Sequence, residues 1–327
     1  MKKIAKNTLD VLTSANFEKE TIEDFYEFFM DAFDPQKFRE ISFADEYTSN
    51  DDFDDIIARA QERGVEKMIT LAGNLDDSES ALKITSKFPD SIFSTVGCHP
   101  TRCSEFLDHK EGPEDYYQRL LKVAKENKKS VVAIGECGLD YDRTQFCPID
   151  VQKRFFKVQF ELAKETGLPM ILHNRNTNND FVDMVKEHRS MFSTAVVHSF
   201  TGSVEEALTI VNDLDLYIGF NGCSLKTEEN LKVIEAIPAE KIMIGTDAPW
   251  CDIRRTHASY KFLDPKYIDA PEQFKKKERF QKGCQVKGRN EPCQLLQVLS
   301  VIANIKKMDI NELATLIYNN TRKVFNI

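Results

Sequence analysis

Four side chains able to bind a metal ion follow short apolar runs that we predict to be β-strands. They are Glu136, His173, His198 and Asp247, separated along the chain by 37, 25 and 49 residues. If the strands are parallel, their carboxyl ends meet at one edge of the fold and bring the four side chains together. Two imidazoles and two carboxylates are a donor set for Zn²⁺, Mn²⁺ or a related divalent ion. The pattern predicts a metal site, in which one carboxylate can bridge two ions.

A metal held in this way is suited to hydrolysis, because it acidifies a bound water and stabilises charge on the scissile group. Asp247 follows the last predicted strand, where its carboxylate can contact the metal and also take the proton of that water as a general base. Each ligand taken singly also fits a structural role, for example a turn at Asp247 or an ion pair of Glu136 with Arg143. Four such residues at the same end of one fold favour the metal site.

Two further residues are candidates for substrate binding. The planar guanidinium of Arg175 carries several N–H donors that suit a phosphate oxygen. A surface ion pair of Arg175 with Asp180 or Asp183 is an equally good interpretation. His99 follows the third predicted strand and can face the same site. The alternative for His99 is a loop position restricted by the proline that follows it.

Eight short apolar runs could position these side chains. We predict strands at residues 25–31, 67–72, 92–98, 131–136, 169–173, 195–198, 216–221 and 242–247. Most are nearly continuously apolar, as strands covered on both faces should be. The first fits an acidic amphipathic helix equally well.

Helical patterns separate these strands, which is typical of parallel βα units. The clearest are residues 150–166, which end at Gly167, and 204–211, 295–305 and 310–319. The alternation favours a closed TIM (β/α)₈ barrel, an α/β fold, over an open doubly wound sheet. The length of 327 residues allows two domains, but one barrel with insertions fits as well. We predict an N-terminal extension at residues 1–24, a single barrel at 25–327 and an insertion at 253–290.

The composition excludes several classes of protein. A hydrophobic content of 41% with 23 Phe is a poor fit to disorder or low complexity. No apolar run is long enough for a membrane span, and no apolar signal region follows the basic start of the chain. The eight cysteines have no CxxC spacing, which argues against a disulfide scaffold or a cysteine zinc site. We expect a reducing compartment, the cytoplasm or the nucleus, and no obligate protein partner is evident.

The formal charge of −9 is unevenly distributed. Residues 253–290 hold eleven Lys and Arg against four acids, a local +7, whereas residues 17–55 hold three bases against fourteen acids, a local −11. The basic segment begins soon after Asp247, so we predict that it lies at the barrel mouth where a phosphate substrate would arrive. A solvated surface loop is the alternative.

Several motifs together resemble the TatD family of metal-dependent deoxyribonucleases, in particular its eukaryotic branch. The resemblance runs from about residue 57 to the C-terminus. Its motifs are Val96-Gly97-Cys98-His99-Pro100, Gly135-Glu136-Cys137-Gly138-Leu139-Asp140, Leu172-His173-Asn174-Arg175, Val197-His198-Ser199-Phe200, Tyr217 to Thr227, Gly245-Thr246-Asp247-Ala248-Pro249-Trp250 and Arg289-Asn290-Glu291-Pro292.

This resemblance implies a TIM barrel of the metal-dependent, amidohydrolase-like type and hydrolysis of DNA phosphodiester bonds by an exonuclease. It implies one or two divalent ions, Mg²⁺, Mn²⁺ or Zn²⁺. By the same resemblance Glu136 is the bridging carboxylate with a catalytic role, His173 and His198 are ligands, and Asp247 is a ligand that also activates water.

The N-terminus departs from the family pattern, which opens on Asp-x-His-x-His or, in this branch, Asp-x-Gly-x-Asn. The register set by Asp34-Pro35 places Glu27, Phe29 and Asp31 at these positions. A rival register uses Ser42, Ala44 and Glu46. In both registers the metal ligands of the first strand stay undetermined.

Three functions are compatible with these patterns. The leading hypothesis is a metal-dependent deoxyribonuclease. The second keeps the site but cleaves an amide or ester, because the same barrel chemistry handles carbonyl groups. The third, suggested by the altered first strand, is a degenerate barrel that binds nucleic acid or a protein without catalysis.

Overall fold

The fold is built around eight parallel strands that follow one another in the sheet in chain order. The computed structural model describes residues 8–11 and 52–327. The strands are β1 (Thr8–Val11), β2 (Val65–Thr70), β3 (Ile92–Val96), β4 (Val131–Asp140), β5 (Met170–Arg175), β6 (Ala195–Val197), β7 (Tyr217–Phe220) and β8 (Ile242–Ile244). Each pairs with the next, and β8 lies against β1, so the sheet curls into a barrel. The predicted TIM-barrel fold is confirmed.

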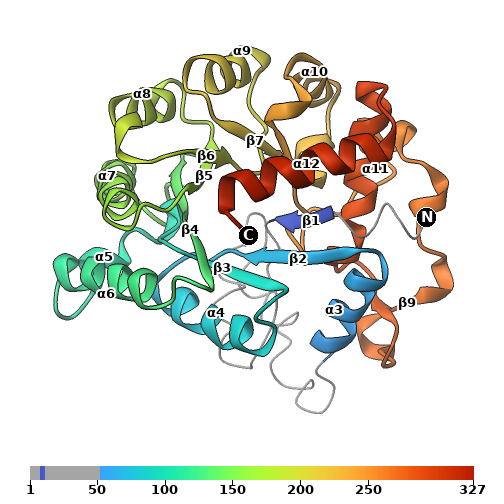
Figure 1. The fold of residues 1–327 in the computed structure, drawn as a ribbon, viewed down its shortest axis with the longest axis horizontal. Coiled ribbons are helices and arrows are strands. Elements are labelled where there is room, and N and C mark those ends of the chain that lie inside the picture. Colours follow the sequence, from blue (N-terminus) through green and yellow to red (C-terminus); the bar gives the residue numbers. More distant parts are fainter. Residues whose placement is uncertain (1–7, 12–51) are drawn as a thin grey trace.

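Helices surround this barrel (Figure 1). They are α3 (Phe53–Glu62), α4 (Leu75–Lys87), α5 (Glu105–Asp108), α6 (Pro113–Glu126), α7 (Ile149–Thr166), α8 (Asp180–Glu187), α9 (Val204–Leu208), α10 (Glu228–Ala236), α11 (Leu295–Lys306) and α12 (Ile310–Phe325). Gly167 ends α7 with a φ of 72°, a left-handed conformation that glycine adopts without strain. The four predicted helices are present, although the predicted helix 204–211 continues as a wider π-type turn, Thr209–Asp213. No helix among the described residues is long and apolar enough to span a bilayer.

Two apolar layers explain why the strand sequences are almost continuously hydrophobic. Alternate strand residues such as Ile69, Ile171 and Met243 point into the barrel, where Val324 and Phe325 at the end of α12 join them. Their neighbours along the strands pack outward against the helices. Figure 1 shows α12 crossing the barrel at this position. Because side chains alternate between the two faces of a strand, strands β3 to β8 are buried on both faces.

The predicted first strand is the main difference from expectation. Residues 25–31, with Glu27, Phe29 and Asp31, lie outside the described residues, as do Ser42, Ala44 and Glu46 of the rival register. The position beside β2 is occupied by β1, with Asp10 paired to Met68. Four residues of the predicted N-terminal extension thus belong to the sheet. The domain boundary at residue 25 stays a prediction.

The basic insertion folds into short turns and two very short strands. β9 (Phe274–Lys275) pairs with β10 (Gln285–Val286) beside α3, where the Gly283 amide donates to Asp55 Oδ2 at 3.1 Å. Buried Asp269 accepts hydrogen bonds from the side-chain amides of Gln285 and Gln294 at 2.7 and 2.6 Å. The insertion is therefore packed onto the barrel. Its predicted contact with DNA stays a prediction.

Glu291 joins the end of the insertion to α3 through a buried cluster of charges. Its carboxylate accepts from Arg59 Nε at 2.7 Å and Nη2 at 3.1 Å, and from Arg289 Nη2 at 3.2 Å. Arg289 Nη1 also donates to Asp52 Oδ1 at 3.1 Å. The Glu291 side chain is 1% exposed, so this charge depends on its partners rather than on water.

We expect Glu291→Gln to lower the free energy of unfolding by about 3 kcal/mol, because it leaves two guanidinium groups facing a neutral amide. Urea denaturation of the two proteins measures this change. Glu228→Gln is the matched control, since Glu228 pairs with Lys261 at 2.7 Å on the surface, where a loss below about 1 kcal/mol is expected. Equal losses in the two variants would contradict the buried-cluster interpretation.

Candidate metal centre

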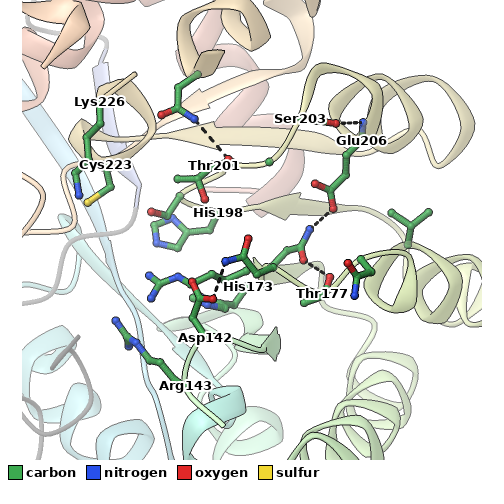
Figure 2. A pocket seen from close by; sticks show the side chains of 18 of the residues that line it. Asp142, Arg143, His173, Thr177, His198, Thr201, Ser203, Glu206, Cys223 and Lys226 are labelled. Atoms are coloured by element: carbon green, nitrogen blue, oxygen red, sulfur yellow. Dashed lines mark hydrogen bonds between the residues drawn. The ribbon is translucent and has the colours of Figure 1, made fainter. Parts of the chain in front are cut away.

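A pocket of about 1480 Å³ opens where the barrel strands end (Figure 2). The side chains of all four predicted ligands line it. Glu136 lies within β4 and His173 within β5, whereas His198 follows β6 by one residue and Asp247 follows β8 by three. All four are at most 8% exposed. The barrel therefore brings together residues that are far apart in sequence.

His173 is held between two carboxylates. Its Nδ1 lies 2.9 Å from Glu136 Oε1, and its Nε2 lies 3.1 Å from Asp140 Oδ2. With Asp140 accepting the proton on Nε2, Nδ1 is left as the ligand atom on the side of Glu136. Asp140 thus sets the orientation and the tautomer of His173.

His198 and Asp247 form the other half of the site. His198 Nε2 lies 2.9 Å from Asp247 Oδ1 and 4.0 Å from Glu136 Oε1. Glu136 Oε1 is therefore close to both histidines. A carboxylate in this position can connect the two halves of the candidate metal centre. Buried His198 Nδ1 has no hydrogen-bond partner among the described residues.

Local backbone features allow this convergence. Gly138 in β4 has a φ of 148°, and a Cβ placed there would lie 2.0 Å from the carbonyl oxygen of His173. Only glycine lets β4 approach β5 this closely beside the ligand. On the other side of the site, Asn290 Nδ2 donates to the carbonyls of Thr246 and Trp250 at 2.9 and 2.7 Å. Asn290 thereby braces the loop that carries Asp247.

Charged groups in the pocket shift the pKa values of its two histidines and of Glu136. Burial alone would lower the pKa of His198, but the carboxylates of Asp247 and Glu136 outweigh it and raise this pKa to about 9. The pKa of His173 is also raised, against the effect of burial, by Asp140 and Glu136. Burial would raise the pKa of Glu136, yet His198 and His173 lower it. Without a cation, the carboxylates thus hold protons on the histidines.

We expect the metal-free protein to lose stability as the pH rises through about 9. Protonated His198 stabilises the fold fully below its ordinary pKa of about 6.5, and this contribution, about 3 kcal/mol for the shift to about 9, disappears as the ring deprotonates. Urea unfolding of chelator-treated protein between pH 6 and 10 measures the loss. His198→Asn should flatten this part of the pH profile, and a profile that the substitution leaves unchanged would contradict the assignment.

His99 lines the pocket, and its Nε2 faces His173. Its Nδ1 accepts the Thr101 backbone N–H at 3.2 Å, and Nε2 lies 3.3 Å from His173 Nδ1. Burial, His173 and Arg143 lower the pKa of His99 well below its usual range, so the ring is neutral. A neutral ring that accepts at Nδ1 carries its proton on Nε2. His99 therefore presents an N–H to the site and is better suited to bind a substrate oxygen than a cation.

The donor set fits a divalent cation. His99, Asp140 and His173 form a compact group that could hold an ion, but the tautomer of His99 argues against this particular triad. Glu136, His173, His198 and Asp247 offer two imidazoles and two carboxylates around Glu136, and His198 Nδ1 is a buried nitrogen without a partner among the described residues. Nitrogen and oxygen donors of this kind suit Zn²⁺, Mn²⁺ and Mg²⁺ to differing degrees.

Two arginines place positive charge beside these carboxylates. Arg175 Nη1 lies 3.7 Å from Asp140 Oδ2, and Arg143 Nε lies 3.8 Å from the same oxygen. Both line the pocket, and Figure 2 shows Arg143 extending toward it. Asp180, a surface partner considered for Arg175, pairs with Lys153 at 3.0 Å.

Asp140 and Arg143 were missed as site residues by the sequence interpretation. The predicted fourth strand ends at residue 136, whereas β4 continues to Asp140. The alternation of side chains along this longer strand places Asp140 on the same side as Glu136. Arg143 was expected only as an ion-pair partner of Glu136, but its charge pairs with Asp140. The motif Gly135-Glu136-Cys137-Gly138-Leu139-Asp140, which extends past residue 136, was the available signal for the longer strand.

Comparisons with known proteins agree with this geometry. A family model described as TatD related DNase matches residues 40–326. The chain is 45% identical to the deoxyribonuclease Tat-D of Schizosaccharomyces pombe, covering 91% of this chain and 94% of that protein. It is 31% identical to the 3'-5' ssDNA/RNA exonuclease TatD of Erwinia tasmaniensis, covering 84% and 94%. A crystal structure of a TatD family hydrolase from Entamoeba histolytica superposes with a TM-score of 0.81 at 28% identity, covering 98% of both chains.

Proposed function

Because the chain belongs to the TatD-related DNase family, we propose that it hydrolyses phosphodiester bonds of DNA with the help of one or two divalent cations. The observation that carries this proposal is the convergence of Glu136, His173, His198 and Asp247 in one pocket that also holds Arg175. We propose exonucleolytic cleavage, because the relative from Erwinia tasmaniensis is named a 3'-5' exonuclease.

The residues that would hold a cation are Glu136, His173, His198 and Asp247. When bound, the cation supplies positive charge that lowers the pKa of water and offsets the negative charge that builds on the phosphate. Asp140 contributes by fixing the tautomer of His173, so that Nδ1 faces the centre.

Asp247 is proposed as the general base. Its Oδ1 lies 2.9 Å from His198 Nε2, and its Oδ2 lies on the side of Cys251. Among the described residues Oδ2 accepts only a long hydrogen bond, 3.7 Å from the Cys251 thiol, and a carboxylate oxygen has a second lone pair with which it can take a proton from the attacking water. The backbone at Asp247 has a φ of 54°, a left-handed conformation that Asp tolerates better than most residues and that turns the chain back over the pocket.

Arg175, Arg143 and His99 are proposed to bind the scissile phosphate. The two guanidinium groups and the Nε2–H of His99 are donors on the side of the pocket that holds Asp140. Donors placed in advance around a phosphate stabilise the charge of the transition state without reorganisation.

We expect Arg175→Ala to lower kcat/KM for DNA cleavage by about 100-fold, because one fork of phosphate donors is lost. Steady-state kinetics on single-stranded DNA measures the loss, and Arg175→Lys should restore only part of it since lysine lacks the fork. Arg322→Ala is the control, because Arg322 lies on α12, where it donates to the backbone carbonyl of Ile327. Equal kinetics for the Arg175 and Arg322 variants would contradict the assignment.

The proposed function is tested with purified protein loaded with Mg²⁺, Mn²⁺ or Zn²⁺. End-labelled linear DNA, closed circular single-stranded DNA, RNA and an acylated amino acid are supplied in parallel. Cleavage of linear but not circular DNA, abolished by a chelator, supports the exonuclease. Cleavage of the acylated amino acid alone would favour the amide or ester hydrolase, and no metal uptake with no cleavage would favour the non-catalytic barrel.

The location of the protein is proposed to be the cytoplasm, the nucleus or both. The support is the spacing of its cysteines, which lacks the pattern of a disulfide framework. Fractionation of cells with an antibody against the chain tests this location.

A further inference from the structure

Two thiols line the wall of the pocket without taking part in the proposed metal site. Cys223 lies in the turn Gly222–Leu225 that follows β7, and Cys251 lies in the loop that follows β8. Both are partly exposed to the pocket, and the two side chains face each other within hydrogen-bonding range. Figure 2 shows Cys223 beside Lys226 on this wall.

The backbones that carry the two thiols are in direct contact. A Cβ placed on Gly222 would lie 1.8 Å from the carbonyl oxygen of Cys251, so only glycine permits this approach. Asn290 holds the second loop from behind through the carbonyl of Trp250, at 2.7 Å. The two loops are thus held together from both sides. A disulfide needs neighbouring backbones of this kind, because its Cα atoms must lie within about 7 Å of each other.

Cys251 also touches the proposed general base. Its thiol donates to Asp247 Oδ2 over 3.7 Å. A sulfur committed to a disulfide has no proton to donate, and it draws the loop of Cys251 toward Cys223. Oxidation at this position would therefore change both the hydrogen bonding and the placement of Asp247.

We propose that Cys223 and Cys251 are a peroxide-sensitive pair whose oxidation to a disulfide reversibly lowers the nuclease activity of the site. The effect on activity rests on the proposed function, whereas the formation of the disulfide does not. The other cysteines are less suited. Cys98 and Cys103 also face each other, but they are at most 1% exposed within the core.

The chemistry balances with hydrogen peroxide as the oxidant. One sulfur, as its thiolate, attacks an oxygen of the peroxide, the O–O bond breaks and the sulfur becomes a sulfenic acid. The other oxygen leaves as hydroxide, which the proton released by the thiol converts to water. The second sulfur then attacks the sulfenic sulfur, the S–S bond forms and a second water leaves. Two thiols and one peroxide thus give one disulfide and two waters. A dithiol reductant reverses the product by thiol–disulfide exchange.

The test treats the Mg²⁺-loaded 327-residue protein with a small excess of hydrogen peroxide and then blocks the remaining thiols with iodoacetamide. Mass spectrometry of the digest is expected to find a peptide pair joining Cys223 to Cys251, lighter by two hydrogen atoms than the separate peptides. DNA cleavage is expected to fall by about tenfold, as for a misplaced catalytic group, and to return with dithiothreitol.

Matched variants separate the pair from general oxidative damage. Cys223→Ser should form no cross-link, and its own activity, whatever its level, should not respond to peroxide. Cys284→Ser should behave like the unaltered protein, because Cys284 is a partly exposed thiol in the insertion and does not line the pocket.

Three results would overturn the proposal. They are the absence of the cross-link, a cross-link at Cys98 and Cys103 in its place, and a cross-link at Cys223 and Cys251 that leaves activity unchanged. A reduced protein that cleaves no DNA would instead count against the proposed function, while the peptide mapping would still decide whether the disulfide forms.

Discussion

An Asp247→Asn variant is expected to cleave DNA about 10³-fold more slowly than the unaltered protein, with the loss in kcat rather than in KM. The amide keeps the shape of the side chain and an oxygen that can face His198 Nε2, 2.9 Å away in the structure, but it cannot take a proton from water. Single-turnover cleavage of end-labelled DNA measures the size of the effect.

Metal content separates the two roles proposed for Asp247. Elemental analysis of the dialysed variant shows whether the cation is still bound when the rate is lost. Asp252→Asn is the control, because Asp252 lies five residues further on in the same loop and pairs with exposed Arg254 at 3.2 Å. Nearly unchanged cleavage by Asp247→Asn would mean that another group takes the proton.

The second large effect is expected at Glu136. Glu136→Gln should weaken cation binding and lower the cleavage rate by about 10²- to 10³-fold, because Glu136 Oε1 lies 2.9 Å from His173 Nδ1 and 4.0 Å from His198 Nε2 and is the carboxylate common to both halves of the site. Isothermal titration calorimetry with Mn²⁺ measures the affinity and the stoichiometry of cation binding directly.

Two comparisons make the Glu136 result specific. Asp140→Asn should have a smaller effect, about 10- to 100-fold, because Asp140 acts through the orientation of His173. Glu205→Gln should have little effect. Glu205 lines the pocket from α9, but it is not one of the four proposed ligands. Tight Mn²⁺ binding by Glu136→Gln would assign the bridging position to another carboxylate.

The strand pattern and the predicted ligands were readable from the sequence for a simple reason. Strands β3 to β8 are buried on both faces, so most of them appear as nearly continuous apolar runs, and a charged or imidazole side chain at the end of such a run is conspicuous. Glu136, His173 and His198 were identified in this way, and the structure places them in one pocket with Asp247. Their roles as ligands remain proposals that the variants above test.

The first strand could not be read in the same way. Residues 25–31 are apolar and acidic in a pattern that suits a strand or a helix, and they lie outside the described residues. The strand beside β2 is Thr8–Val11, a run of four residues too short to show a period. Pairing with β2 identifies Thr8–Val11 as a strand of the sheet, and such pairing is not visible in a local pattern.

The sequence by itself determined that this chain forms parallel βα units, that imidazole and carboxylate side chains follow several of its strands, and that its motifs are those of the TatD family. Only the tertiary structure decided that Asp140 orients His173, that Asn290 braces the Asp247 loop, and that Cys223 meets Cys251. Periodicity records which face of each element is buried, because burial acts residue by residue along the chain. Contacts between loops from different strands depend on the register in which the barrel closes, and no local pattern encodes that register.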